Sequence, residues 1–329
     1  MKTLSISIAA YNIERFIDNT LRNLCEDDII DDLEIIIVND GSKDNTLVRA
    51  NMYKEKYPDS IRIINKDNGG YGSTINASLM VATGKYFKLL DGDDWYDYGS
   101  LKKIITFLKD SDVDLVVTPH VQVIDETGEK EIIRPFSHEL ENQKMTYKDY
   151  PIGQRICMHQ ACFKTRVIQN RGITITENCF YTDVEYLLKC MSKCDTIIYV
   201  EYPLYMYRIG LNEQSMSVEG MKKHYKDGVK SYKELIRFKN EDVHNQEFEA
   251  YLQDAMISLG RYYLNIFFIL DISKKQEYID FDKYIRKNAS DIYDAMASRK
   301  LSFMRKTHNI FYSLMCLYAR RKVKSAIRL

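Results

Sequence analysis

The sequence predicts an α/β protein with a mostly parallel central sheet flanked by helices, followed by a C-terminal helical extension. Two observations support this. Over the first 118 residues, short apolar runs rich in β-branched side chains alternate with segments whose apolar residues repeat at helical spacing, which is typical of a parallel sheet covered by helices. From about residue 217 onward, apolar residues repeat at helical spacing alone, which indicates helices packed on helices.

Five runs in the first part are expected to form strands. They are residues 4–9 (LSISIA), 33–39 (LEIIIVN), 61–65 (IRIIN), 85–90 (KYFKLL) and 114–118 (DLVVT). Three helices are expected between them. The first has one apolar face, the second covers residues 44–57, and the third covers residues 73–84 and is expected to stop at Gly84. The residues that make one face of the first helix are Phe16, Ile17, Thr20, Leu21 and Leu24, and those at helical spacing in the second are Leu47, Ala50 and Tyr53.

The remaining chain is predicted in three parts. Residues 120–134 form a hairpin whose turn contains Thr127 and Gly128. Residues 156–208 combine short strands with one helix that begins at Asp183. The helical extension covers residues 217–329, which leaves 1–216 as the α/β domain. Within the extension the helical repeat includes Leu252, Met256, Leu259, Tyr263 and Ile266.

The composition argues against a nucleic-acid partner and against a membrane span, and it leaves a peripheral membrane contact open. Lys plus Arg and Asp plus Glu number 47 each, so no overall positive field predicts a nucleic-acid partner. No apolar run approaches the ~20 residues of a membrane span, and the first residues do not resemble a signal peptide. The chain is therefore expected in the cytoplasm, and a peripheral contact with the inner face of the plasma membrane stays open.

The last 35 residues, 295–329, are basic and contain no acid. Two explanations of this tail remain open. It either packs onto the extension with its basic side chains in solvent, or lies as an interfacial helix on an anionic membrane. Its apolar residues at roughly helical spacing are Phe303, Ile310, Phe311, Leu314, Leu317 and Tyr318, and its basic residues are Arg299, Lys300, Arg305, Lys306, Arg320, Arg321, Lys322, Lys324 and Arg328.

The seven cysteines do not form a CxxC motif, and their odd number argues against a complete disulfide framework. Cys157, His159 and Cys162 have the composition of metal ligands. A zinc site wants a second ligand pair, however, and none lies nearby in the sequence. Reduced and mostly buried thiols are the favoured prediction.

Polar clusters follow four of the expected strands. They are Tyr11-Asn12, NDGSKDNT with Asp40, NKDNGGYGSTIN, and DGDDW with Asp91, Asp93 and Asp94. Ligands bind beyond the carboxyl ends of parallel strands, so these clusters predict one site. Neither GxGxxG nor a Walker sequence is present, which removes the main support for dinucleotide and P-loop sites.

The DGDDW carboxylates repel one another, and an exposed turn, a helix N-terminus or a bound cation would each explain them. The companion clusters favour the cation. Mg²⁺ and Mn²⁺ take carboxylate and phosphate oxygens as ligands. Carboxylates beside a glycine loop therefore predict a metal-bridged diphosphate.

These segments, in this order, resemble the family 2 inverting glycosyltransferases of the GT-A fold. The likeness covers roughly residues 3–215 and has five motifs: 7–24 (SIAAYNIERFIDNTLRNL), 33–46 (LEIIIVNDGSKDNT), 68–95 (NGGYGSTIN through LLDGDDW), 180–189 (FYTDVEYLLK) and 205–217 (YMYRIGLNEQSMS). The sequence departs from the family pattern at Ala9, where a proline is usual, and at Ile75, where an arginine is common.

The resemblance implies a role for each matching residue. The nucleotide would be bound by Ala9, Tyr11, Asp40, Asp91 and Gly92, with Asp40 accepting from a ring N–H of the base and Asp91 contacting the ribose or sugar. Asp93 would bind Mn²⁺ or Mg²⁺, and Asp183 would be the catalytic base. Further donor or diphosphate contacts would come from Asn68, Gly69, Arg208, Gln214 and Ser215. Residues 1–118 would be the nucleotide-binding half and 119–216 the acceptor half.

The implied activity is transfer of a sugar, with inversion, from a UDP- or dTDP-linked donor. The acceptor would be a hydroxyl of a saccharide or lipid-linked saccharide in cell-surface polysaccharide synthesis. Asp183 is expected to be kept ionised by its place at a helix N-terminus, or else to be only that helix's first acid. Glu185 is expected to be a supporting or surface group.

Two other functions fit the sequence less well. A catalytically silent sugar- or nucleotide-binding module has no need of both Asp93 and Asp183. A sugar-phosphate nucleotidylyltransferase needs a basic glycine-rich loop near the N-terminus, where this sequence has AAYNIERF. The glycosyltransferase is therefore favoured.

Overall fold

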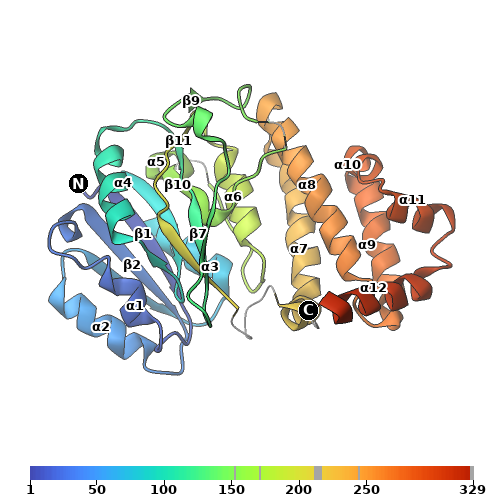
Figure 1. The fold of residues 1–329 in the computed structure, drawn as a ribbon, viewed down its shortest axis with the longest axis horizontal. Coiled ribbons are helices and arrows are strands. Elements are labelled where there is room, and N and C mark those ends of the chain that lie inside the picture. The colour runs from blue at the N-terminus through green and yellow to red at the C-terminus, as the bar shows by residue number, and fades with distance from the viewer. Residues whose placement is uncertain (152, 170–171, 211–216, 244, 327–329) are drawn as a thin grey trace. The chain divides into compact units, whose positions relative to one another are not determined.

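The computed structural model describes residues 1–329 except 152, 170–171, 211–216, 244 and 327–329. The chain divides into two compact units, Met1–Leu211 and Asn212–Leu329, shown in blue to yellow-green and in yellow to red in Figure 1. The expected boundary after residue 216 borders an undescribed segment, so it stays a prediction. Each unit is described by itself below.

The first unit contains an eight-stranded sheet in the order β3-β2-β1-β4-β10-β6-β11-β9. The first four strands of the chain pair in parallel, as their alternation with helices predicts. Strand β10 is antiparallel to both of its neighbours, β4 and β6. A strand from the second half of the domain thus separates two strands of the first half. The bounds are β1 (Leu4–Ala10), β2 (Leu33–Asp40), β3 (Ile61–Lys66), β4 (Tyr86–Asp91), β6 (Leu115–Val117), β9 (Lys144–Met145), β10 (Ala161–Lys164) and β11 (Ile197–Tyr199).

A smaller sheet has the order β5-β12-β7-β8. Its strands are β5 (Trp95–Tyr96), β7 (His120–Ile124), β8 (Lys130–Ile133) and β12 (Tyr205–Ile209). Strands β7 and β8 form the predicted hairpin, and Gly128 in its turn has φ +70°. Strand β12 lies between β5 and β7, which brings residues 205–209 against the DGDDW turn.

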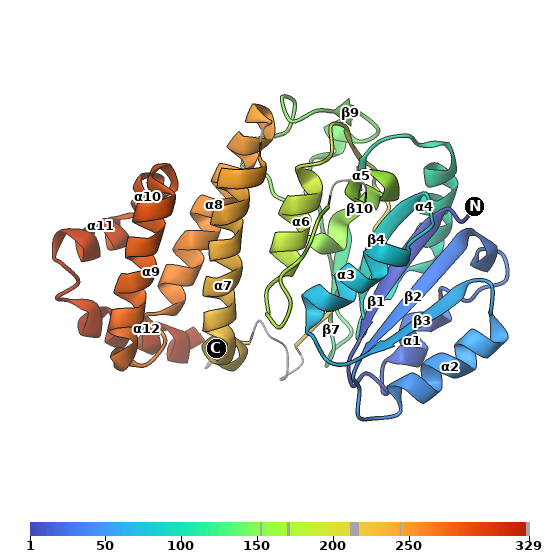
Figure 2. The ribbon, with the colours of Figure 1, turned by 180° about the vertical axis from the view of Figure 1, so that it is seen from behind.

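Helices cover both faces of the larger sheet. Helices α1 (Ile17–Arg22), α2 (Thr46–Lys56) and α4 (Tyr98–Asp110) share one buried apolar cluster with the side chains of β1 and β2 that face them. Helices α3 (Tyr71–Val81), α5 (Thr165–Gln169) and α6 (Asp183–Met191) lie on the other face, toward the viewer in Figure 2. On this face Ser7 Oγ donates to Ser78 Oγ at 2.7 Å. Helix α5 was not predicted, because a five-residue helix has little periodicity.

The predicted role of Gly84 is wrong. Helix α3 ends at Val81 and its C-cap is Ala82, so Gly84 lies beyond the helix. A Cβ built at Gly84 would lie 2.6 Å from the backbone nitrogen of Ser5. The glycine therefore allows the chain to pass close to β1, and it does not stop the helix.

The second unit is helical throughout its described residues, as the spacing of its apolar residues predicts. Its helices are α7 (Val218–Asp242), α8 (Gln246–Ile266), α9 (Lys275–Asn288), α10 (Ser290–Ala295), α11 (Arg299–Lys306) and α12 (Tyr312–Ala326). Two glycines bring α7 and α8 close together, since a Cβ at Gly228 would lie 2.3 Å from the Tyr263 ring, and one at Gly260 2.5 Å from the Tyr232 hydroxyl. In the described part of the chain, no helix has the length and apolar character that crossing a membrane requires.

Candidate active site

The register of the parallel strands gathers the predicted polar residues at one edge of the sheet. Ala9 on β1 pairs with Asp91 on β4. Ala10 pairs with Asn39 on β2, and Asp40 pairs with Lys66 on β3. The carboxyl ends of β1 to β4 therefore meet, as the sequence predicts, and the glycine loop and the DGDDW turn both leave from this edge.

Asp94 fastens the DGDDW turn to β12. Its side chain is buried, with 1% of the residue exposed. The Tyr205 hydroxyl donates to Asp94 Oδ2 at 2.8 Å, and the backbone N–H of Arg208 donates to Oδ1 at 2.7 Å. Asp94 is therefore a positioning residue, a role that the sequence did not predict.

The neighbouring carboxylates of Asp91 and Asp93 lie in an environment that disfavours their charge. Burial, with the charges of Asp93 and Asp183, raises the pKa of Asp91 to about 7. Burial also raises the pKa of Asp93, against the lowering effect of Arg208. Tyr71 supports Asp91, because its hydroxyl donates to Asp91 Oδ1 at 2.6 Å.

These carboxylates fit a divalent cation. Oxygen ligands are those that Mg²⁺ and Mn²⁺ prefer, and a cation would relieve the repulsion between them. Ligand atoms of Asp91, Asp94 and His159 lie within 4.8 Å of one another. Both Asp94 oxygens already accept hydrogen bonds, so Asp91 and Asp93 are the better candidates to hold the ion.

Arg208 lies beside this turn. Its Nε donates to the Asp93 carbonyl oxygen at 2.9 Å, and its guanidinium pairs with Asp125. The same group stacks over the Trp95 ring at 4.9 Å. The predicted diphosphate contact thus has a positive charge in place at the acidic turn. Two further predicted contacts, Gln214 and Ser215, lie outside the described residues.

Asp40 holds the glycine loop. Only 3% of the residue is exposed. Its Oδ1 accepts from Lys66 Nζ at 2.7 Å and from the Gly69 N–H at 2.9 Å, and its Oδ2 accepts from the Gly70 N–H at 2.9 Å. The Asn68 side-chain amide donates to the Asp40 carbonyl oxygen at 2.9 Å. These contacts favour a role in shaping the loop, and the predicted contact with a nucleobase stays a prediction.

The other residues assigned to nucleotide binding lie around β1. Tyr11, just beyond β1, is 52% exposed, so its ring is accessible to a base. A Cβ at Gly92 would lie 2.6 Å from the Ala9 carbonyl oxygen. Gly92 is therefore needed for the acidic turn to pack against the end of β1. Thr20 Oγ1 donates to the carbonyl oxygen of Gly92 at 2.9 Å.

The glycine loop also holds the segment that leads to Asp183. The Asn178 N–H donates to the Gly69 carbonyl oxygen at 2.6 Å. Asn76 on α3 donates to the Ile175 carbonyl oxygen and accepts from the Ile175 N–H, both at 2.9 Å. Residues 175–178 are therefore fastened to α3, and α6 begins five residues later.

Replacing Gly72 with alanine is expected to damage both stability and activity. A Cβ there would lie 2.1 Å from the Thr176 carbonyl oxygen, so residues 175–178 would have to move. Such overpacking typically costs about 1–3 kcal/mol of stability. We expect a lower thermal midpoint and a lower catalytic rate. A matched control is Gly99→Ala on α4, whose Cβ would meet its nearest atom at 3.5 Å; equal losses in both variants would contradict the prediction.

Asp183 begins α6, as predicted. Its ionisation differs from the expectation, because burial raises the pKa of its carboxyl and outweighs the lowering effect of the backbone N–H of Val184. The Asp183 charge acts on Asp91 and Tyr71, raising the pKa of both. Its place after the segment that the glycine loop holds makes Asp183 the candidate base of this site.

Glu185 is a supporting group, and the alternative that it lies at the surface is wrong. The residue is fully buried. Its Oε1 accepts from Lys189 Nζ at 2.8 Å and from the Thr176 N–H at 3.0 Å. Glu185 thus binds α6 to the segment that precedes it and takes no part at the edge with Asp91.

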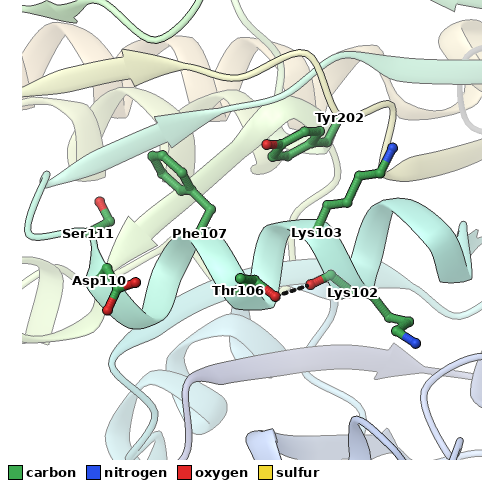
Figure 3. Close-up of a pocket in the computed structure, with 7 residues that line it drawn as sticks. All are labelled: Lys102, Lys103, Thr106, Phe107, Asp110, Ser111 and Tyr202. Carbon is green, nitrogen blue, oxygen red and sulfur yellow. Dashed lines mark hydrogen bonds between the residues drawn. The ribbon is translucent and has the colours of Figure 1, made fainter.

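A surface hollow elsewhere in the first unit is not part of this site. It is lined by α4 and Tyr202, and Figure 3 shows the rings of Phe107 and Tyr202 above the helix. Ser111, just after α4, also lines the hollow. Tyr86, the first residue of β4, donates from its hydroxyl to Ser111 Oγ at 3.1 Å. The hollow therefore lies toward the beginning of β4, whereas Asp91 ends that strand.

The family follows from a sequence comparison. The model described as glycosyl transferase family 2 matches residues 5–172, about half of the chain. The chain is a family 2 glycosyltransferase. The match includes the glycine loop and the DGDDW turn, whereas Asp183 and Arg208 lie beyond it.

Relatives and solved structures agree with this family. The glycosyltransferase is 25% identical to EpsH of Bacillus subtilis (strain 168) over 270 residues, 77% of this chain and 74% of EpsH. It is 29% identical to the minor teichoic acid biosynthesis protein GgaB of the same organism over 136 residues, 40% of this chain and only 15% of GgaB. The chain thus spans a small part of GgaB's length.

Two solved structures confirm a GT-A type fold. S. aureus TarS 1–349 in complex with UDP-GlcNAc superposes with a TM-score of 0.69 at 18% identity, covering 100% of this chain and 92% of that one. The mannosyltransferase PcManGT from Pyrobaculum calidifontis, in complex with GDP-Man and Mn²⁺, has a TM-score of 0.54 at 15% identity, covering 96% and 84%.

The residues that support the site were not predicted from the sequence. Tyr71, Tyr205 and Asp94 form a hydrogen-bonded chain around Asp91. All three lie inside the five motifs, and the spacing of Tyr205 and Tyr207 on one face of a strand is a pattern that could have indicated Tyr205. Lys66 pairs with Asp40 at this edge, whereas Ile75, at the position where an arginine is common in the family, is buried within α3.

Proposed function

We propose that this protein transfers a sugar from a nucleoside diphosphate sugar to a hydroxyl of a saccharide or lipid-linked saccharide, with inversion of the anomeric carbon. One observation carries the proposal. The strand register and the contact of Arg208 with the Asp93 carbonyl oxygen gather Asp91, Asp93 and Arg208 at one edge, and Asp183 begins the helix that follows the segment held by the glycine loop at that edge. This arrangement combines a base with a place for a metal-bound diphosphate.

Asp183 acts as the general base. A sugar hydroxyl is a poor nucleophile at neutral pH, and a carboxylate that accepts its proton accelerates attack typically ~10²–10⁴-fold. The raised pKa of Asp183 brings its basicity closer to the operating pH. Attack from the side opposite the leaving diphosphate inverts the anomeric carbon, and no covalent intermediate with the enzyme forms.

Positive charge at the acidic turn stabilises the leaving diphosphate. Arg208 is fastened beside the turn by its contact with the Asp93 carbonyl oxygen. When bound by Asp91 and Asp93, Mn²⁺ or Mg²⁺ supplies further stabilisation of the departing negative charge. The Mn²⁺ present in the PcManGT complex supports manganese as the ion.

Uridine or thymidine is the proposed base of the donor. The UDP-GlcNAc bound by TarS supports this, and the exposed ring of Tyr11 just beyond β1 offers a surface on which a base can stack. Calorimetry with UDP, dTDP, CDP and GDP in the presence of Mn²⁺ is expected to rank the uridine or thymidine diphosphate first. Tighter binding of CDP than of UDP would contradict the proposal, and a screen of nucleotide sugars for hydrolysis would then identify the donor directly.

The acceptor is proposed to belong to a cell-surface polymer made at the cytoplasmic face of the membrane. The likeness to GgaB, a minor teichoic acid biosynthesis protein, supports this class of product. A lipid-linked acceptor would be reached most easily by an enzyme bound to the membrane surface, which makes the basic C-terminal tail relevant.

The tail presents an apolar face beside exposed basic side chains. Leu301, Met304 and Tyr312 are buried within the second unit, whereas Ile310 is 71%, Leu314 60% and Leu317 50% exposed. Arg299, Lys306 and Arg321 are exposed as well. Arg305 is not available, because it pairs with Asp282 at 2.7 Å. This pattern supports an interfacial helix that binds anionic lipid.

We expect the full chain to sediment with vesicles that contain phosphatidylglycerol at low salt. Each basic residue near such a surface contributes up to about 1 kcal/mol, and salt screens this attraction. The Leu314→Glu/Leu317→Glu variant is expected to stay in solution. Met52→Glu, which charges a comparably exposed apolar position on α2, is the matched control. Failure of the wild-type chain to bind, or equal binding of both variants, would contradict the prediction.

A further inference from the structure

A cysteine and a histidine around the short turn at residues 157–160 join a histidine of β7 in a cluster of metal-binding side chains. Cys157 Sγ lies 3.3 Å from His159 Nδ1 and 3.8 Å from His120 Nδ1. Ligand atoms of the three residues all lie within 4.8 Å of one another. Two imidazoles and a thiol are ligands typical of Zn²⁺, in contrast to the oxygen ligands of the acidic turn.

The distances agree with a tetrahedral zinc ion. Zn–S bonds of ~2.3 Å and Zn–N bonds of ~2.0–2.1 Å imply about 3.6 Å between a sulfur and a nitrogen ligand, and about 3.4 Å between two nitrogens. The two sulfur–nitrogen distances, 3.3 and 3.8 Å, lie on either side of the expected value. The sulfur–nitrogen separations therefore suit one ion, and the ligand nitrogens, which lie within 4.8 Å of each other, would close around it on binding.

The surroundings hold the ligands in place. The His159 ring stacks on Tyr207 with centroids 4.4 Å apart and meets Tyr205 edge-on at 4.6 Å. His120 is only 5% exposed. The second nitrogen of His159, Nε2, lies 4.0 Å from Asp91 Oδ2. Zinc-bound histidines characteristically direct their other N–H at a carboxylate, and the Asp91 carboxylate lies just beyond hydrogen-bond distance of this nitrogen.

The buried ammonium group of Lys88 is hydrogen-bonded to backbone carbonyl oxygens near the cluster. Lys88 is buried, and its Nζ donates to the carbonyl oxygens of His159 at 2.7 Å and Ala161 at 3.1 Å. The Cys157 thiol is not in a disulfide and is partly buried. Binding of a metal deprotonates such a thiol, so we expect Zn²⁺ to release one proton from Cys157 when it binds.

We propose that His120, Cys157 and His159 bind one Zn²⁺ ion, with a water molecule as the fourth ligand. Three protein ligands and an open position are characteristic of accessible zinc sites. The ion fixes the ring of His159 beside Asp91, so this site adjoins the donor site without sharing its carboxylates. The sequence alone placed Cys157 and His159 with Cys162 and offered no further ligand, because His120 lies 37 residues earlier in the chain than Cys157.

Cobalt and zinc titrations of the full-length protein test this site. With Co²⁺, a thiolate-to-metal charge-transfer band in the near ultraviolet is expected for the wild type, and one equivalent of Zn²⁺ is expected to abolish it. Cys157→Ser should lose the band. His120→Asn should weaken Zn²⁺ binding by more than about tenfold, as measured by competition with a chromophoric chelator.

Two controls distinguish this site from others. Cys25→Ser, which changes another partly buried thiol of the same unit, should keep the band. Asp93→Asn should also keep the band. The band comes from the Cys157 thiolate, whereas Asp93 belongs to the acidic turn, where a bound metal would have no sulfur ligand. A wild type without the band and without Zn²⁺ affinity, or a band that survives in Cys157→Ser, would overturn the proposal. If Cys157→Ser does not fold, unchanged Zn²⁺ affinity in His120→Asn would overturn it instead.

Discussion

Replacing Asp183 with asparagine is expected to lower the rate of sugar transfer at least about a hundredfold while donor affinity stays unchanged. The amide keeps the shape of the side chain but cannot accept the proton of the acceptor hydroxyl. Steady-state transfer and calorimetric binding of the donor nucleotide measure the two effects separately. Asp195→Asn, which changes an exposed acid beyond the end of α6, is the control for a general loss of charge.

The same variant is expected to have a higher thermal midpoint. Burial raises the pKa of Asp183 in the folded protein, so at neutral pH the ionised carboxylate destabilises the folded state. Its neutral replacement removes that cost. As the pH falls through the raised pKa, the wild type should gain the proton, lose activity and be relieved of the same cost. If donor binding and stability both collapse in Asp183→Asn, the residue is only a structural part of α6.

Replacing Asp93 with asparagine is expected to abolish measurable transfer and to weaken donor binding in the presence of Mn²⁺. The substitution removes a charged oxygen ligand from the acidic turn, and metal assistance contributes several kcal/mol to such reactions. Donor calorimetry with and without Mn²⁺ should show that the metal strengthens binding in the wild type and has little effect in the variant.

Asp110→Asn is the control for this substitution, because Asp110 is an exposed acid on α4, at the end away from the acidic turn. It should leave both donor binding and transfer unchanged. The metal prediction fails if Asp93→Asn keeps full activity, or if excess chelator does not slow the wild-type enzyme.

Local patterns in the sequence were sufficient for most elements of the first sheet and for the edge at which the polar clusters gather. The β-branched runs became β1 to β4; β1, β2 and β4 are almost wholly buried, and a buried parallel strand must be apolar on both faces. The start of α6 at Asp183 and the β7–β8 hairpin were also confirmed. Each of these features depends on neighbours within a few residues, so the pattern and the structure describe the same interactions.

The contacts that complete the site join residues far apart in the chain. Asp94 accepts from Tyr205 and Arg208, 111 and 114 residues away, and no periodicity connects such positions. Three other features depend in the same way on tertiary packing: the insertion of β10 beside β4, the closeness of Gly84 to β1 and the burial of Glu185. Whether a polar side chain lies in solvent or supports a catalytic group depends on what packs against it, which only the tertiary structure decides.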